Sequence, residues 1–203
     1  MAYMQLAVQI NLNFSKTMER LEHKQGTIFT IDQFFTETEC NEHIAWSEKR
    51  GYQQAKINAF GKQVTKTDVR NNSRIIFKDE ALAEWIWKRV EPFCVSKLGD
   101  SSAIGLNEMF RFYKYGIGQK FKAHRDGSYE RNETEWSLYT LMIYLNENYL
   151  GGDTWFEDLV IQPKTGMALI FKHDLLHEGR EVIKGVKYVL RTDIMYKYER
   201  NGK

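Results

Sequence analysis

The pattern of polar and apolar positions predicts helices in the first half of the chain and strands in the second. Thr36 is followed three residues later by Glu39, which is the spacing of a capping box at the start of a helix. We expect this helix to run to about Arg50 and to end at Gly51. A strand is expected just before it, at 27–35, where β-branched and aromatic residues dominate.

A second helix is predicted over residues 80–90. Asp79 can cap its start, and helical spacing then places three apolar side chains on one stripe, namely Leu82, Ile86 and Val90. Pro92 cannot continue the hydrogen bonds of a helix interior, so the helix ends near it. Short strands are also expected in the segments 53–64 and 74–77.

From Gly105 onward, short apolar segments are separated by turns rich in Gly, Asn and Asp. The eight expected strands are 106–115, 119–124, 136–146, 152–157, 159–162, 167–172, 179–183 and 186–196. Such a series of short strands favours a sandwich or jelly roll. Segment 136–146 is apolar on both faces, so we expect both to be covered, one of them by the predicted helices.

Length and composition are those of one domain. The chain has 203 residues, 42% of them hydrophobic, which is enough to bury a core of ordinary size. We therefore expect a mainly β fold with N-terminal helices packed on the major sheet. Within a single domain over 1–203, the expected parts are an irregular lead-in at 1–25, supporting helices and strands at 26–104, and a jelly-roll core at 105–198.

Charge and cysteine content limit the partners and the compartment. The net charge of +2 is too small to indicate binding to nucleic acid. No apolar run is long enough to cross a membrane, and the N-terminus lacks the basic region of a signal peptide. Cys40 and Cys94 lie far apart in no metal-binding or redox pattern, so we expect free thiols in a reducing, cytoplasmic environment.

The segment 111–126 contains the first candidate for chemistry. It ends in His124 and Asp126, which are two residues apart and therefore point to the same side of an extended segment, with Arg125 facing away. A 2-His-1-carboxylate triad binds non-haem Fe(II) on one face and leaves the opposite positions open. The pair would supply two of the three ligands.

The third ligand must be another histidine. His23 lies in the irregular lead-in and His43 on the first predicted helix, where ordinary solvent-facing or capping roles are expected. His173 and His177 both follow the apolar strand at 167–172. We favour His177, because it opens the next strand, whereas His173 lies in a turn.

The last predicted strand, 186–196, adds a second polar feature. Strand alternation places Lys187 and Arg191 on one face, together with Val189 and Asp193. Many iron enzymes with such a triad use 2-oxoglutarate as a co-substrate, and a buried cation on this face would bind its far carboxylate. The alternative is that this face is exposed to solvent. Zinc accepts the same ligands as iron, so the residues alone leave the metal open.

Three motifs in order give the chain a resemblance to a known family. HRD at 124–126, LLHEG at 175–179 and GVKYVLRTDIMY at 185–196 closely resemble the prolyl 4-hydroxylase-like group of Fe(II)/2-oxoglutarate-dependent dioxygenases. The resemblance covers about 106–196 and implies a double-stranded β-helix, the jelly roll expected above, with N-terminal helices bracing its major sheet.

The resemblance also implies roles for individual residues. It assigns the metal to His124, Asp126 and His177, and the distal carboxylate of 2-oxoglutarate to Lys187. Tyr115 and Tyr144 match tyrosines that line the co-substrate site, and Thr140 shares the face of Tyr144; a place in the core is the ordinary alternative for the tyrosines. Arg191 is expected to contact the substrate or co-substrate, or to pair with a nearby acid.

The implied reaction is oxidative decarboxylation of 2-oxoglutarate with O2, coupled to hydroxylation of a substrate. Family analogy adds ascorbate as a reductant. Alternatives are a non-catalytic jelly-roll module that binds iron or an oxoacid, and a zinc hydrolase, which would leave Lys187 without a role.

A prolyl or other protein side chain is the first expectation for the substrate and a small metabolite the second. Loop 66–73 and segment 127–135 are the expected rim. Arg70, Asn71, Asn72 and Arg74 are its candidate contacts or, alternatively, a solvated loop.

Overall fold

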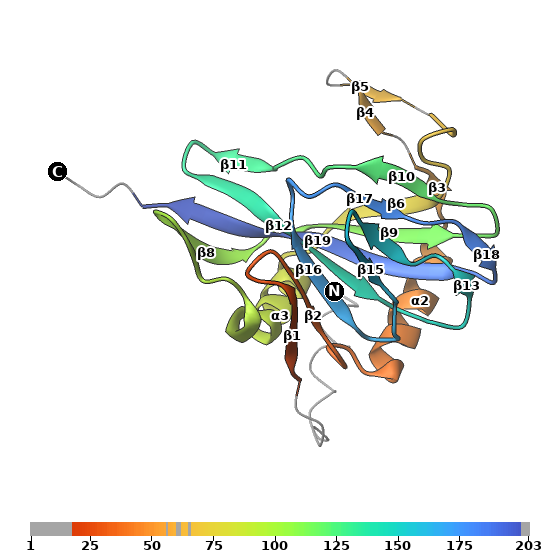
Figure 1. Ribbon diagram of the computed structural model, residues 1–203, viewed down its shortest axis with the longest axis horizontal. Coiled ribbons are helices and arrows are strands. Elements are labelled where there is room, and N and C mark those ends of the chain that lie inside the picture. The colour runs from red at the N-terminus through yellow and green to blue at the C-terminus, as the bar shows by residue number, and fades with distance from the viewer. Residues whose placement is uncertain (1–17, 56, 60–61, 65, 200–203) are drawn as a thin grey trace.

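The computed structural model describes residues 18–55, 57–59, 62–64 and 66–199. A large antiparallel sheet dominates it, and two helices and a smaller sheet pack against this sheet (Figure 1). The large sheet has the order β1-β2-β16-β12-β19-β9-β6-β3. Its strands are β1 Arg20–Lys24, β2 Ile28–Ile31, β16 Ala168–Lys172, β12 Glu135–Tyr144, β19 Lys187–Tyr198, β9 Met109–Tyr115, β6 Ser73–Lys78 and β3 Gln53–Gln54, with β7 Lys97–Leu98, β8 Ser101–Leu106 and β11 Glu130–Asn132 at its margins.

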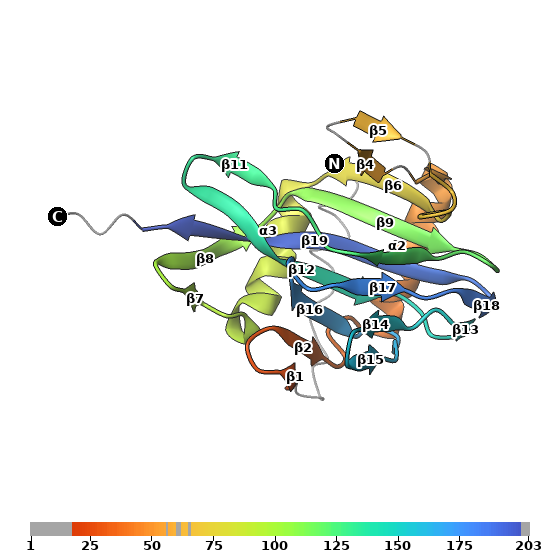
Figure 2. The same ribbon diagram turned by 45° about the horizontal axis from the view of Figure 1, so that its top comes forward.

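The smaller sheet has the order β10-β17-β14-β15. Its strands are β10 Phe121–His124, β17 His177–Gly179, β14 Thr154–Phe156 and β15 Leu159–Ile161. Two strand pairs complete the described part, β13 Leu150–Gly151 with β18 Val182–Lys184, and β4 Ile57–Ala59 with β5 Lys62–Val64. The β4–β5 hairpin projects beyond the large sheet near β6 (Figure 2). The two antiparallel sheets, one packed on the other, confirm the predicted jelly roll (Figure 1).

Both predicted helices are present with the expected capping. Helix α2 spans Glu37–Arg50; Thr36 Oγ1 accepts from the backbone N–H of Glu39 at 3.1 Å, and Glu39 returns the contact to the N–H of Thr36. Helix α3 spans Glu80–Val90 and starts at Asp79, whose carboxylate accepts from the N–H of Leu82. A short 3-10 turn, Glu91–Phe93, follows α3.

The large sheet has a separate core on each face, as its central strand β12 requires. Alternate residues of this strand, Tyr139, Leu141 and Ile143, are buried in the cluster that α2 and α3 complete. Tyr144 belongs to the second cluster, which includes Phe156 of the smaller sheet. The prediction that this strand is covered on both faces is confirmed.

Part of the first half differs from the expectation. Residues 1–25 were expected to lack regular structure, but Arg20–Lys24 forms β1 and pairs with β2. β2 and β6 in turn pair with β16 and β9, so these N-terminal strands belong to the large sheet itself. Residues 1–17 lie outside the described part. None of its helices is long and apolar enough to span a membrane.

Candidate metal centre

Two neighbouring strands of the smaller sheet bring the candidate ligands together. His124 ends β10 and lies directly opposite His177, which opens the antiparallel strand β17. Asp126 follows two residues later, and its backbone N–H donates to the carbonyl of His173 at 3.0 Å. Candidate ligand atoms of His124, Asp126 and His177 all lie within 4.8 Å of one another. The two expected ligands and the favoured third one therefore converge.

Backbone contacts orient both imidazole rings toward this point. Nδ1 of His124 lies 2.8 Å from the carbonyl oxygen of Lys122, and Nδ1 of His177 lies 3.0 Å from that of Leu175. A carbonyl only accepts, so each Nδ1 carries the proton and each Nε2 presents a lone pair. The Nε2 of His124 lies 3.7 Å from Oδ1 of Asp126, and the Nε2 of His177 lies 3.7 Å from Oδ2. This is a donor set for a metal ion.

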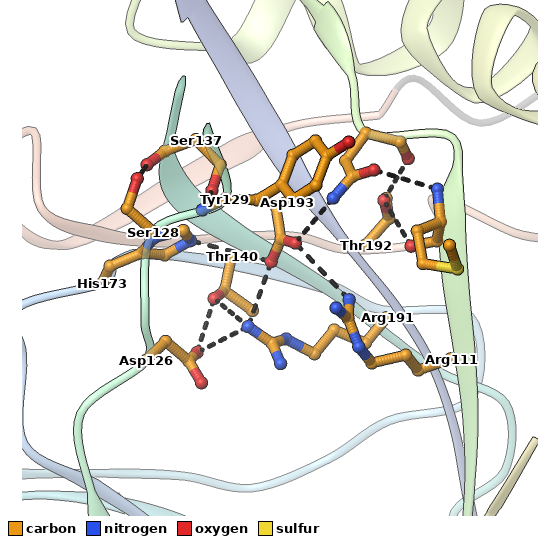
Figure 3. Close-up of polar contacts among 12 residues, drawn as sticks. Arg111, Asp126, Ser128, Tyr129, Ser137, Thr140, His173, Arg191, Thr192 and Asp193 are labelled. Carbon is orange, nitrogen blue, oxygen red and sulfur yellow. Dashed lines mark hydrogen bonds and ion pairs between the residues drawn. The ribbon is translucent and has the colours of Figure 1, made fainter. Parts of the chain in front are cut away.

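Asp126 is held in its charged form. Burial alone would raise its pKa, but the guanidinium of Arg191 outweighs this effect and holds the pKa of Asp126 well below its usual range. Oδ2 accepts from Thr140 Oγ1 at 2.6 Å and lies 3.0 Å from Nη2 of Arg191 (Figure 3). Oδ1 faces the Nε2 of His124, and Oδ2 faces the Nε2 of His177.

His177 is neutral over the physiological range. Burial lowers the pKa of its imidazole to about 4, with Asp126 opposing the effect in part. A neutral imidazole is the form that binds metals.

A pocket extends from these ligands along the large sheet to Lys187. Its lining residues are Tyr113, Tyr115, Phe121, His124, Asp126, Met142, Thr154, His177, Gly179, Lys187, Val189 and Arg191. The predicted polar face of β19 therefore lines a pocket, and the alternative of a solvated face is wrong.

Lys187 is buried at one end of the pocket, with only 3% of its surface exposed. Its Nζ donates to the carbonyl of Gly152 and lies 5.5 and 5.1 Å from the ring centroids of Tyr115 and Tyr144. Burial lowers the pKa of Lys187 to about 7, although Asp153 opposes this. A carboxylate bound beside it would favour the charged form.

The two predicted tyrosines lie near this lysine and are buried. Tyr115 lines the pocket, whereas the hydroxyl of Tyr144 is 2.6 Å from Oγ1 of Thr154, which also lines it. Thr140 was expected beside the co-substrate with Tyr144, but its hydroxyl donates to Asp126. Thr140 therefore helps to orient Asp126, a candidate metal ligand.

Arg191 pairs with acids, which is one of the alternatives that the sequence left open. Its Nη2 lies 3.0 Å from Asp126 Oδ2 and 3.0 Å from Asp193 Oδ1, and also donates to Thr140 (Figure 3). The two carboxylates raise the pKa of Arg191 well above its usual value despite its burial. A permanently charged guanidinium thus links Asp126 to Asp193.

The other histidines have separate contacts. Nε2 of His173 lies 3.7 Å from Oδ1 of Asp193. The Nε2 of His23 lies 2.9 Å from the Thr30 hydroxyl, and His43 Nδ1 lies 2.8 Å from the carbonyl of Glu39.

The loop at 66–73 is less solvated than the alternative interpretation of the sequence proposed. Arg70 and Asn72 are 4% and 0% exposed, and Arg70 Nε donates to Asn72 Oδ1 at 2.7 Å. The reason is a backbone bridge between Arg70 and Phe121, which draws the loop against the pocket wall. Tyr113 and Arg111 were not among the predicted site residues; their only signal in the sequence is the alternation that places them on the same face of the strand as Tyr115.

Comparison with known proteins agrees with this geometry. Residues 110–192, which include all three candidate ligands and Lys187, match the model of the 2OG-Fe(II) oxygenase superfamily. No curated protein matches the chain.

Solved structures with the same fold include three prolyl hydroxylases. The viral collagen prolyl hydroxylase of Paramecium Bursaria Chlorella virus-1, in complex with 2OG, is 24% identical over 85% of this chain and 97% of its own, with a TM-score of 0.63. A Trichoplax adhaerens prolyl hydroxylase in complex with a hypoxia inducible factor oxygen degradation domain peptide is 18% identical. The match covers 87% of this chain and 86% of that one, with a TM-score of 0.67. A Pseudomonas putida prolyl-4-hydroxylase is 15% identical over 84% of this chain and 92% of its own, with a TM-score of 0.57.

Proposed function

We propose that this chain, whose residues 110–192 match the model of the 2OG-Fe(II) oxygenase superfamily, is a dioxygenase that couples decarboxylation of 2-oxoglutarate to hydroxylation of a substrate carbon. The observation that carries the proposal is the convergence of His124, Asp126 and His177 at one end of a pocket that has a buried lysine, Lys187, at the other. The first group suits the metal and the second suits the co-substrate.

The donor set fits Fe(II). Two imidazoles present Nε2 atoms, and an anionic carboxylate lies beside them. When bound, Fe(II) and 2-oxoglutarate supply the oxidising chemistry, with O2 consumed and succinate and carbon dioxide released. Thr140 and Arg191 hold Oδ2 of Asp126 and so fix the direction of the carboxylate.

Lys187 is the proposed partner of the distal carboxylate of 2-oxoglutarate. It lies in a closed, apolar part of the pocket, where an ion pair is little screened by water. Tyr115 and Tyr144 shape this part of the pocket, and the Thr154 hydroxyl adds a polar group to its lining. These contacts would place the keto-acid end of 2-oxoglutarate toward the metal ligands.

The alternative functions fit the pocket less well. A zinc hydrolase would use the three ligands but would leave a buried lysine with no charged partner. A non-catalytic module that binds only an oxoacid would need no metal ligands, yet His124, Asp126 and His177 are all positioned to bind a metal ion.

The substrate class is less constrained. The names of two similar structures, a collagen prolyl hydroxylase and a prolyl hydroxylase with a bound peptide, support a protein side chain as the first candidate, and a small metabolite is the second. Ascorbate as a reductant and a cytoplasmic location stay predictions.

The direct test is spectroscopic. Fe(II) and 2-oxoglutarate are added to the protein without oxygen, and the visible metal-to-ligand charge-transfer band is recorded. Oxygen is then admitted and succinate is measured. Folded, iron-loaded protein that gives neither the band nor succinate would contradict the proposal, whereas a band without succinate under any substrate mixture would favour the non-catalytic module.

A further inference from the structure

Tyr113 lines the pocket and is close to three arginines, of which Arg191 lines the pocket with it. Its hydroxyl accepts from Nη1 of Arg191 at 3.4 Å, and the Cζ of Arg70 lies 4.5 Å from the centroid of its ring. Arg111 is on the same face of β9, two residues before Tyr113, and pairs in register with Arg191. A pocket-lining hydroxyl is thus surrounded by three guanidinium groups.

We propose that the primary substrate carries a carboxylate, which binds at Tyr113 in the positive field of Arg70, Arg111 and Arg191. This inference rests on the proposed function and narrows its substrate class to acids, whether a small molecule or an acidic residue of a peptide.

The balance of charge around Tyr113 supports this inference. The charge of Arg191 is matched by Asp126, and Arg111 Nη1 lies 3.4 Å from Oδ2 of Asp193 (Figure 3). Arg70 pairs with no acid in the part of the chain that the structure describes. A further anion bound on this side of the pocket would balance the charge of Arg70.

Arg70 is also incompletely hydrogen-bonded, although it is buried. Its Nε donates to Asn72, but its Nη2 has no hydrogen-bond partner within the described residues. The rings of Tyr113 and Phe121 lie 4.5 and 4.3 Å from its Cζ, and both rings line the pocket. Cation–π contacts offset only part of the cost of burying a charge, so an anion on the pocket side of these rings would add stability.

The hydroxyl of Tyr113 can donate to such a ligand. It accepts from Arg191, and its own proton has no acceptor in the described structure. Burial would raise the pKa of Tyr113, but the guanidinium groups of Arg191, Arg70 and Arg111 outweigh burial and lower it to about 8. The surroundings therefore favour a negative charge beside this hydroxyl, and a bound carboxylate would provide it.

The site is separate from the one proposed for 2-oxoglutarate. On the paired strands, Lys187 lies opposite Tyr115, whereas Tyr113 lies opposite Val189. This step of two residues corresponds to about 7 Å along the sheet. One distal carboxylate cannot contact Lys187 and Tyr113 together, and the keto-acid end of 2-oxoglutarate is the part proposed to face the metal ligands. The group around Tyr113 is therefore left for a carboxylate of another acid.

The test uses protein loaded with Mn(II) and 2-oxoglutarate, and calorimetric titration with matched acids and amides. One pair is N-acetyl-proline and N-acetyl-prolinamide, which represents a small acid. The other is the blocked dipeptide amides Pro-Glu and Pro-Gln, which represent an acidic peptide. We expect one carboxylate to bind at least about tenfold more tightly than its amide, because charge-assisted hydrogen bonds in a little-hydrated pocket are strong.

Variants connect that preference to the arginine group. Arg111→Gln and Tyr113→Phe should each reduce the acid-to-amide ratio severalfold, while the affinity for 2-oxoglutarate stays within about twofold of the native value. Lys114→Gln is the matched control: it removes one positive charge from the same strand, but Lys114 faces Glu48 at 2.8 Å on the opposite side of the sheet. Its ratio should equal that of the native protein.

The outcomes separate this inference from the proposed function. If neither acid binds more tightly than its amide, or if Tyr113→Phe weakens 2-oxoglutarate instead, the substrate-carboxylate site is wrong while the oxygenase function stands. If native protein with Fe(II) and 2-oxoglutarate lacks the charge-transfer band, the proposed function fails and this inference fails with it.

Discussion

Arg191 and Asp126 share a buried ion pair, with Nη2 of the arginine 3.0 Å from Oδ2 of the aspartate. Thr140 donates to the same oxygen, so two contacts fix the carboxylate, whose Oδ1 lies 3.7 Å from His124 Nε2 and whose Oδ2 lies 3.7 Å from His177 Nε2. Arg191 therefore contacts the candidate metal site through Asp126. In the sequence alone, the same residue was equally suited to contact a substrate.

Replacing Arg191 by methionine should destabilise the protein and weaken metal binding. Asp126 and Asp193 would both remain buried without their common partner, and breaking a buried pair costs about 3–5 kcal/mol. Loss of a residue that orients a ligand should reduce Mn(II) affinity by about 10–100-fold. Denaturant unfolding and metal titration measure the two effects; Arg191→Lys, which keeps the charge, should lose less of both. Native-like metal affinity in the methionine variant would contradict the proposed orienting role.

Asp126→Ala and His177→Ala should each abolish tight binding of Fe(II), because no neighbouring group has the position to replace a lost ligand. His173→Ala should leave metal affinity nearly unchanged, since its ring lies against Asp193. Anaerobic metal titration of the three variants checks this. A variant at His173 that loses the metal while the variant at His177 keeps it would reverse the assignment.

Lys187→Ala should weaken 2-oxoglutarate much more than it weakens the metal. A buried carboxylate without its cation loses about 3–5 kcal/mol, which corresponds to an increase in Kd of more than a hundredfold. Lys184→Ala is the control, because this lysine is exposed on the nearby strand β18. Titration of 2-oxoglutarate into the Mn(II)-loaded variants distinguishes them. Stronger retention of 2-oxoglutarate by Lys187→Ala than by Arg191→Met would show that Lys187 is the wrong cation.

Binding of 2-oxoglutarate should weaken as the pH rises above about 7. In the empty pocket, burial lowers the pKa of Lys187 from 10.5 to about 7, and the co-substrate binds the protonated form. Above that pH, binding must take up a proton, so Kd should rise by up to tenfold per pH unit. Affinities measured from pH 6 to 9 test this, and Lys187→Arg, which stays charged, should remove the trend.

The same pKa shift predicts the pH dependence of stability without ligands. The lysine has a pKa of 10.5 in the unfolded chain and about 7 in the folded one, so the unfolded state binds more protons between these values. The free energy of unfolding should therefore rise with pH over this window through this group. Urea unfolding of native protein and Lys187→Met should show the rise in the first and its absence in the second.

Local interactions were sufficient to predict both helices and the His124–Asp126 pair. The capping box of Thr36 and Glu39 and the cap at Asp79 act over three residues, and both helices begin where these residues place them. The His124 and Asp126 pair is equally local, since strand geometry alone puts side chains two apart on one side.

Tertiary structure decided the contacts between distant segments. Only the pairing of β10 with β17 brings His177 opposite His124 and leaves His173 against Asp193. Only the bridge to Phe121 buries Arg70, and only the register of β19 in the sheet places Arg191 between two acids. The sequence by itself determined both helix starts and the shared side of His124 and Asp126, because spacing and capping are short-range. Which partners they meet depends on strand register, which is set by packing of the whole core.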